Sequence, residues 1–144
     1  MKKWQYPKQL DYSGVRSGAS GGSNLGRVML VDDSLPFLRN FSSVLQSQGY
    51  EVRTADSGLK AVDLAVSFTP DLISLDYDMP GLDGVGTLIK IREKLPEVKV
   101  IFISGRMDLE AVTMALASGA SECVTKPVNI NRLLNIVQAL IQSR

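Results

Sequence analysis

The feature of this 144-residue chain that most constrains its fold is a regular alternation of short apolar runs with longer amphipathic segments. The short runs have the β-branched and apolar content of buried strands and cover residues 28–31, 50–54, 72–75, 98–103 and 122–125. After each run, apolar residues recur at helical spacing, over residues 36–48, 57–68, 85–95, 109–117 and from 130 onward. Strands that alternate strictly with helices predict an α/β fold, in which helices cover both faces of a parallel sheet.

Residues with strong positional preferences mark the ends of the predicted helices. Ser34 and Asn129 are suitable N-caps, and Pro36 suits a first helical turn. Pro96 and Gly119 end the third and fourth helices, because proline cannot continue a helix and glycine tolerates a left-handed cap. Because the predicted strands are parallel, the loops that follow them meet at one edge of the sheet, where open α/β sheets bind their ligands.

Composition narrows the possible classes of protein. With 44% hydrophobic and 22% charged residues the chain fits one globular domain, and a net charge of +1 gives no basic field for nucleic acid. The absence of histidine excludes Ser-His-Asp or Cys-His catalysis, and the single cysteine excludes an internal disulfide. No apolar run approaches the ~20 residues that span a bilayer. We therefore expect a cytoplasmic protein that binds neither nucleic acid nor membrane.

The first 26 residues differ from the rest, so the predicted domain covers residues 27–144. Residues 14–24 are rich in glycine and serine, a composition typical of a flexible linker. We interpret residues 1–26 as a flexible tail. The alternative is a short docking peptide that anchors on a partner through Trp4 and Tyr6.

Polar residues that suit phosphoryl chemistry follow four of the predicted strands. Asp32 and Asp33 follow the first strand, Asp76 the third, Ser104 the fourth and Lys126 the fifth. Carboxylates brought together repel one another unless a cation joins them, and all-oxygen ligation suits Mg²⁺. A carboxylate nucleophile, a metal ion, an ammonium and a hydroxyl around one point predict a phosphoryl-transfer site.

Each of these residues alone has a simpler structural interpretation. Asp32 or Asp33 alone would more often be a helix cap, Ser104 a turn residue and Lys126 a surface charge. Their joint placement at the ends of the strands favours the functional interpretation.

The chain resembles the receiver domains of two-component response regulators, in the CheY-like superfamily. The motifs are VDDS (31–34), SLDYDMPGLDG (74–84), FISG (102–105) and VTKPV (124–128), in the family's order and spacing. The resemblance covers residues 27–144. It implies a doubly wound (βα)5, flavodoxin-like three-layer sandwich with a five-stranded parallel sheet in the order 2-1-3-4-5.

The resemblance implies a role for each acidic residue at the site. Asp76 would accept the phosphoryl group. Mg²⁺, or Mn²⁺ in its place, would be bound by Asp33 directly, by Asp32 through water, by Asp76 and by the backbone carbonyl of Asp78.

The remaining motif residues would bind the phosphoryl group or shape the site. Ser104 would hydrogen-bond the aspartyl phosphate and shift toward it on activation, while Lys126 would pair with a phosphate oxygen. Pro127 would follow a cis peptide bond, a geometry tolerated mainly before proline. Pro80 and Gly81 would shape the loop after the acceptor.

The chain as a whole would then be a phosphorylation-activated switch rather than an enzyme, apart from accepting the group and slowly hydrolysing it. The implied phosphodonor is a histidine kinase or a phosphotransfer protein. The implied reader of the conformational change is a downstream protein target or a fused output domain.

Cys123 departs from the family's usual residue, and Asp78 stands at a position that varies within the family. Cys123 stands where the family usually has Tyr or Phe, and we interpret it as a small buried hydrophobe, with a redox role as the alternative. Asp78 and Arg106 lie two residues past Asp76 and Ser104, and we expect them to pair across the mouth of the site and partly gate attacking water.

Two other functions compete with the switch. The Asp76-Tyr77-Asp78 stretch also looks like the nucleophile motif of haloacid-dehalogenase-type phosphatases, but there the acidic metal pair follows the lysine instead of coming first. The second rival is an interaction module that keeps the fold and works without phosphorylation, for which Cys123 is the only support.

Overall fold

The computed structural model describes residues 24–105 and 108–143. Strands and helices alternate along these residues, as the sequence predicts. The strands are β1 (Arg27–Val31), β2 (Glu51–Ala55), β3 (Leu72–Asp76), β4 (Lys99–Ser104) and β5 (Glu122–Thr125). The helices are α1 (Leu35–Ser47), α2 (Gly58–Phe68), α3 (Gly84–Lys94), α4 (Leu109–Ala117) and α5 (Ile130–Gln142).

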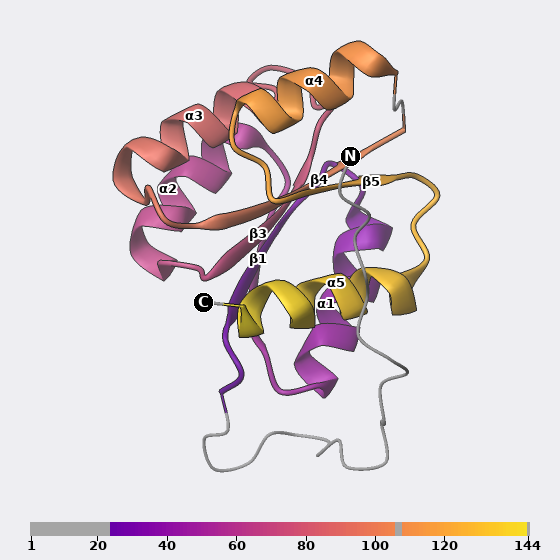
Figure 1. The fold of residues 1–144 in the computed structure, drawn as a ribbon. Coiled ribbons are helices and arrows are strands. Elements are labelled where there is room, and N and C mark those ends of the chain that lie inside the picture. The colour runs from indigo at the N-terminus through magenta and orange to yellow at the C-terminus, as the bar shows by residue number, and fades with distance from the viewer. Residues whose placement is uncertain (1–23, 106–107, 144) are drawn as a thin grey trace.

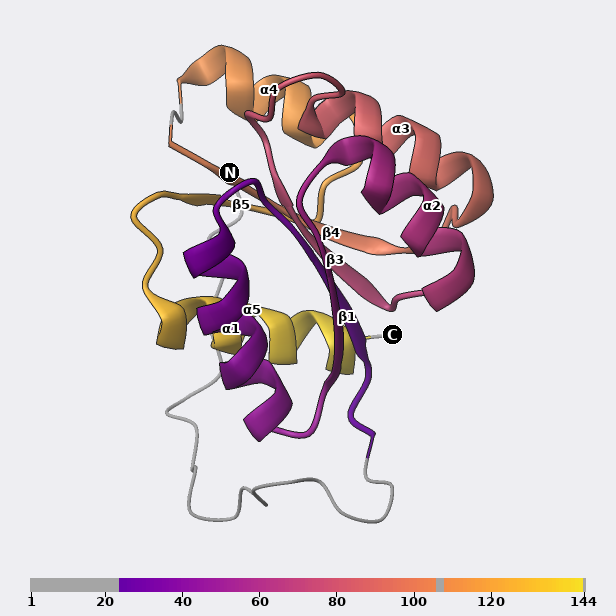
Figure 2. The ribbon, with the colours of Figure 1, turned by 180° about the vertical axis from the view of Figure 1, so that it is seen from behind.

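The strands form one parallel sheet in the order β2-β1-β3-β4-β5. Helices α1 and α5 lie on one face of this sheet, and α2, α3 and α4 cover the other (Figures 1 and 2). The predicted three-layer doubly wound fold and its strand order are therefore confirmed.

The helices begin where short polar side chains satisfy their first backbone N–H groups. The Ser34 side chain accepts from the N–H of Phe37, and the Asn129 side chain accepts from that of Arg132, so both predicted N-caps are confirmed. In the described part of the chain, no helix combines the length and the apolar character needed to cross a bilayer.

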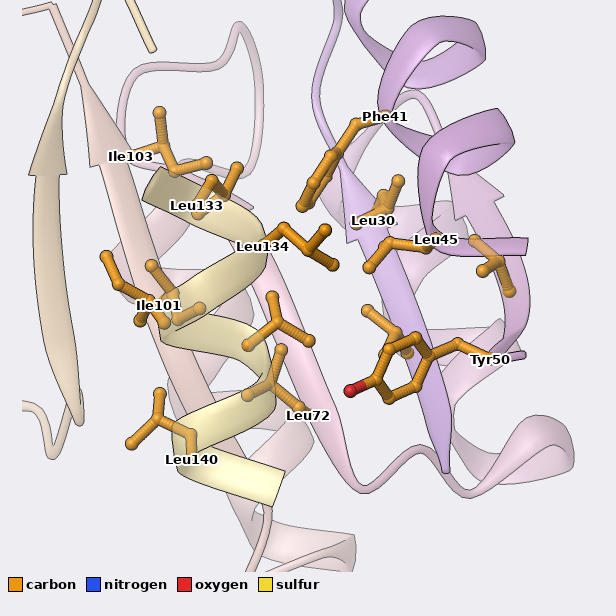
Figure 3. Close-up of a cluster of buried hydrophobic side chains, with 14 of the residues drawn as sticks. Leu30, Phe41, Leu45, Tyr50, Leu72, Ile101, Ile103, Leu133, Leu134 and Leu140 are labelled. Atoms are coloured by element: carbon orange, nitrogen blue, oxygen red, sulfur yellow. The ribbon is translucent and has the colours of Figure 1, made fainter. Parts of the chain in front are cut away.

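Two apolar cores, one on each face, hold the layers together. On the first face, Leu30 of β1 and Ile101 of β4 pack with Phe41 of α1 and Leu134 of α5 (Figure 3). On the second face, strand residues such as Leu75 pack against α2 and α3. Every residue of β3 is buried, as expected for the central strand of a sheet covered on both sides.

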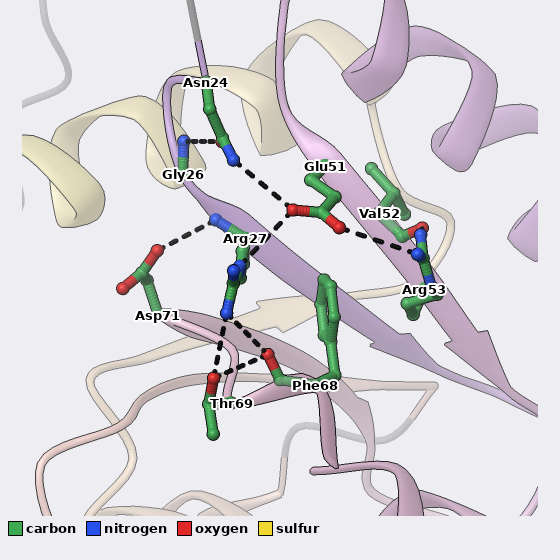
Figure 4. Close-up of polar contacts among 9 residues, drawn as sticks. All are labelled: Asn24, Gly26, Arg27, Glu51, Val52, Arg53, Phe68, Thr69 and Asp71. Carbon is green, nitrogen blue, oxygen red and sulfur yellow. Dashed lines mark hydrogen bonds and ion pairs between the residues drawn. The ribbon is translucent and has the colours of Figure 1, made fainter. Parts of the chain in front are cut away.

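A polar network fixes the edge of the sheet at which β1 and β2 begin (Figure 4). Nε of Arg27 lies 3.3 Å from Oε1 of Glu51, and Nη1 of Arg27 donates to the carbonyl of Phe68 and to the hydroxyl of Thr69. The guanidinium groups of Arg27 and Arg53 lie 5.9 and 5.3 Å from the centre of the Phe68 ring. Such contacts stabilise the end of the sheet at which the strands begin, opposite the end that carries the aspartates.

The described residues before β1 are attached to the loop after α1 and to the first residue of β2. Leu25 donates its N–H to the carbonyl of Gly49, and Glu51 donates to the carbonyl of Gly26. The tail boundary at residue 26 stays a prediction. The interpretations of residues 1–23, including Trp4 and Tyr6, lie outside the described residues.

Candidate functional site

The register of the sheet brings the sequence-predicted residues together at one edge. Val31 lies beside Leu75 in the β1–β3 pair, so Asp32 emerges next to Asp76. Asp76 itself lies beside Ile103 in the β3–β4 pair, one residue before Ser104.

The fifth strand brings Lys126 to the same edge. Ser104 lies beside Thr125, and the N–H of Lys126 donates to the carbonyl of Ser104 at 2.7 Å. The Lys126–Pro127 peptide bond is cis, which confirms the expectation taken from the family resemblance.

Three carboxylates form a tight acidic cluster at these strand ends. Asp32, Asp33 and Asp76 each contribute an oxygen, and all three oxygens lie within 4.8 Å of one another. Asp32 and Asp76 are 1% and 3% exposed, whereas Asp33 is exposed. Two of the three carboxylates are therefore held out of water, and the third lies at the surface.

Hydrogen bonds from the main chain orient the two buried carboxylates. Oδ1 of Asp32 accepts from the N–H of Ser34 at 2.8 Å, and Oδ1 of Asp76 accepts from the N–H of Asp78 at 3.3 Å. The remaining oxygen of each, Oδ2, points toward Lys126, whose Nζ lies 3.3 Å from Asp32 and 3.5 Å from Asp76. Apart from this ion pair with Lys126, the buried Oδ2 of Asp32 accepts no hydrogen bond from the described residues, so it retains lone pairs for a cation.

Electrostatics at the cluster raise the pKa of two groups. Burial is the main cause that raises the pKa of Asp76 to about 6, and the charge of Asp32 adds to it, against the opposing effect of Lys126. Burial alone would lower the pKa of Lys126, but the charges of Asp32 and Asp76 outweigh it and raise that pKa. The Lys126 ammonium thus stays charged, but its single positive charge does not balance the three carboxylates of the cluster. A divalent cation would relieve this imbalance.

Ser104 and Asp78 contact each other directly. The Ser104 hydroxyl donates to Oδ2 of Asp78 at 3.3 Å, and Ser104 is buried whereas Asp78 is exposed. Sequence reasoning missed this contact. The expected Asp78–Arg106 pair lies outside the described residues, because the structure does not describe Arg106.

Cys123 is half-buried and packs on the core that α2 and α3 cover. It lies beside Phe102 in the β4–β5 register, and Phe102 packs edge to face on Tyr77, with ring centres 5.6 Å apart. Burial, with a smaller effect of Glu122, raises the pKa of the Cys123 thiol. This environment supports the interpretation of Cys123 as a small apolar residue.

Gly84 is a site residue to which sequence reasoning gave no role. A Cβ at this position would lie 2.5 Å from the carbonyl oxygen of Asp76 and 2.9 Å from Cα of Tyr77 and from Cε1 of Phe102. Only glycine therefore lets the start of α3 approach the backbone of Asp76 this closely. The available signal was the glycine that directly follows the helix cap Asp83.

This arrangement agrees with the comparison with known families. Residues 28–138 match the family described as the response regulator receiver domain. The chain belongs to this family.

Individual receiver proteins show the same likeness. The chain is 35% identical over 118 residues to the transcriptional regulatory protein PrrA of Mycobacterium tuberculosis, which covers 82% of this chain and 51% of PrrA. It is 34% identical over 119 residues to the chemotaxis protein CheY of Treponema pallidum, covering 81% of this chain and 83% of that protein. The chain thus spans about half the length of the PrrA proteins it matches.

Solved receiver structures share the fold as well. A chain of the CheX–CheY–BeF3–Mg²⁺ complex from Borrelia burgdorferi is similar with a TM-score of 0.74 and 29% identity. The match covers 79% of this chain and 87% of that one.

Proposed function

We propose that this receiver domain is a signalling switch that accepts a phosphoryl group on Asp76 with the help of Mg²⁺ or Mn²⁺. The observation that carries the proposal is the position of Asp76. Its carboxylate is buried, lies within an acidic cluster and has the Lys126 ammonium 3.5 Å away. These are the parts that phosphoryl transfer needs, since it depends mainly on positioning and on neutralising charge.

The donor set fits a hard divalent cation. Three carboxylates with oxygens within 4.8 Å of one another, and a buried Oδ2 of Asp32 without a hydrogen bond, are suited to oxygen-preferring ions. Asp33 would bind the ion directly, Asp32 through water, and Asp76 and the backbone carbonyl of Asp78 would complete the protein ligands. When bound, the ion would neutralise the negative charge of the transferring group.

Side chains of this domain would carry out the transfer of the phosphoryl group, and water would later remove it. A carboxylate oxygen of Asp76 attacks the phosphorus of a phosphohistidine, the phosphorus–nitrogen bond breaks and its electron pair returns to the imidazole. Lys126 balances the charge of the phosphoryl oxygens, and the Ser104 hydroxyl donates a hydrogen bond to one of them. Water later reverses the modification by attack on the phosphorus, which releases inorganic phosphate and the Asp76 carboxylate.

The donor in this account is a histidine kinase or a phosphotransfer protein. These 144 residues contain no histidine, so the phosphohistidine must lie outside them. A protein target or a fused output domain would read the conformational change, and the switch would work in the cytoplasm without binding nucleic acid itself. The solved complex with BeF3 and Mg²⁺ to which this chain is similar supports a site of this chemistry.

We regard the chain as a switch rather than a metabolic enzyme. The order of its motifs supports this view over a phosphatase of the haloacid-dehalogenase type, because the acidic pair Asp32 and Asp33 precedes the nucleophile.

The experiment that tests the proposal is intact-mass spectrometry after incubation with acetyl phosphate. We expect the wild type to gain one phosphoryl group in Mg²⁺, and neither the wild type in EDTA nor Asp76→Asn in Mg²⁺ to gain it. A folded wild type that gains nothing in Mg²⁺ would contradict the proposal and favour an interaction module that works without phosphorylation.

A further inference from the structure

The hydroxyl of Ser104 is engaged before any phosphoryl group is present. It lies at the end of β4, 1% exposed, and donates to Oδ2 of Asp78 at 3.3 Å. The carboxylate of Asp78 reaches it from the exposed loop that follows the acceptor. The residue expected to contact the phosphoryl group therefore already has an acceptor from the protein itself.

A serine hydroxyl has one proton and can donate it to one strong acceptor at a time. A phosphoryl oxygen on Asp76 and the Asp78 carboxylate would compete for this proton. The existing hydrogen bond is long, and hydrogen bonds weaken steeply away from their preferred length, so a well-placed phosphoryl oxygen can displace it.

The main chain around Ser104 restricts how this exchange can take place. The carbonyl of Ser104 accepts from the N–H of Lys126 at 2.7 Å, and Ser104 lies beside Thr125 in the sheet. The backbone is thus held on the β5 side. The hydroxyl can then pass from one acceptor to the other by a rotation of the side chain.

We propose that Asp78 is a positioning residue that holds the Ser104 hydroxyl in the unphosphorylated state and so opposes the activated one. This inference rests on the proposed function and adds a regulatory element to it. The N–H of Asp78 donates to Oδ1 of Asp76 at 3.3 Å, so its backbone is tied to the acceptor. Negative charge added at Asp76 repels the Asp78 carboxylate and favours release of the hydroxyl.

The inference has a thermodynamic consequence. A phosphoryl mimic must break the Asp78–Ser104 contact before it can bind Ser104. Its apparent affinity is therefore the intrinsic affinity multiplied by the fraction of molecules in which Asp78 does not hold the hydroxyl. Removing the Asp78 carboxylate should therefore tighten binding of the mimic. The gain must shrink when Ser104 has no hydroxyl, because the competition then no longer exists and only the repulsion between the charges is relieved.

The test is a double-mutant cycle on binding of beryllofluoride in saturating Mg²⁺, followed by fluorine NMR. The variants are wild type, Asp78→Ala, Ser104→Ala and the double variant. Asp56→Ala is the matched control: it removes an exposed charge after β2, and β1 and β3 separate that strand from β4. We expect Asp78→Ala to tighten binding by about 3- to 10-fold in the wild-type background and by a smaller factor in the Ser104→Ala background, where only the charge effect remains.

A general effect of charge would give a different pattern. If Asp78→Ala tightens binding equally in both backgrounds, or if Asp56→Ala has the same effect, competition for the hydroxyl is wrong while the phosphorylation switch remains intact. If the wild type binds no beryllofluoride and accepts no phosphoryl group from acetyl phosphate, the proposed function fails, and this inference with it.

A second measurement keeps the test valid if Ser104→Ala binds the mimic too weakly to titrate. The side-chain carboxyl carbon of Asp78, followed by carbon NMR, should shift in Ser104→Ala, and in the same direction when beryllofluoride is added to the wild type. An Asp78 signal that is unchanged by Ser104→Ala would overturn the proposal.

Discussion

Nζ of Lys126 lies 3.5 Å from Oδ2 of Asp76, so this carboxylate shares its environment with a cation from the residue that directly follows the last strand. The same nitrogen lies 3.3 Å from Oδ2 of Asp32. One ammonium therefore bridges two buried carboxylates.

Lys126→Met should destabilise the fold in buffer without divalent metal, because it leaves these two carboxylates uncompensated. We expect the free energy of unfolding near pH 7 to fall by about 1–2 kcal/mol, since Lys126 is partly exposed and its effect is screened. Urea unfolding measures the change. Lys60→Met is the matched control, because Lys60 forms an exposed ion pair with Asp56 and should change stability little. Equal losses in the two variants would contradict the bridging role.

Asp76→Asn should stabilise the metal-free protein, and the gain should depend on pH. Because the pKa of Asp76 is raised from 3.8 to about 6, the folded form binds more protons than the unfolded form between these values. The contribution of this group to stability therefore falls as pH rises through that window, and the penalty is complete above about pH 6. We expect a gain of about 1–3 kcal/mol near pH 7 that fades toward pH 4, measured by urea unfolding in EDTA. A gain that is constant with pH would show that the carboxylate is not perturbed in this way.

Gly84→Ala should disturb the backbone of the acceptor. Its Cβ would lie 2.5 Å from the carbonyl oxygen of Asp76, so α3 or the loop after β3 must shift. We expect a loss of about 1–3 kcal/mol in stability and slower phosphorylation by acetyl phosphate. Gly105→Ala is the control for stability, because a Cβ there meets no described atom within 4 Å. Wild-type stability in Gly84→Ala would contradict the close approach.

Cys123 should behave as a half-buried apolar residue rather than as a reactive thiol. Because burial raises its pKa, we expect alkylation by iodoacetamide near neutral pH to be slower than that of free cysteine by about tenfold or more, and to become fast in urea. Cys123→Ser should still accept a phosphoryl group. Rapid alkylation of the folded protein, or loss of phosphorylation in Cys123→Ser, would favour the redox alternative.

Most of the fold could be predicted because the apolar runs are short, β-branched and separated by helical periodicity. Strands β2 and β4 lie one residue later than predicted, β1 begins one residue earlier and β3 ends one residue later, because the ends of a strand depend on pairing rather than on composition. The placement of Asp32, Asp76, Ser104 and Lys126 at one edge follows from the topology of parallel strands.

The details that the sequence did not reveal depend on contacts between residues far apart in the chain. Ser104 and Asp78 are separated by 26 positions, and their hydrogen bond depends on how two side chains turn at the mouth of the site. The need for glycine at position 84 arises from the approach of α3 to β3; the sequence shows a glycine after the cap Asp83, but it does not show which backbone atoms that glycine meets.

The most direct test of the account is the position of the phosphoryl group on the chain. The wild type would be incubated with Mg²⁺ and acetyl phosphate and then reduced with borohydride, which converts an aspartyl phosphate to homoserine. The digested protein would be sequenced by tandem mass spectrometry. We predict homoserine at Asp76 alone and only after incubation with Mg²⁺. Homoserine at Asp33, Asp78 or another aspartate, with Asp76 unchanged, would contradict the assignment of the acceptor.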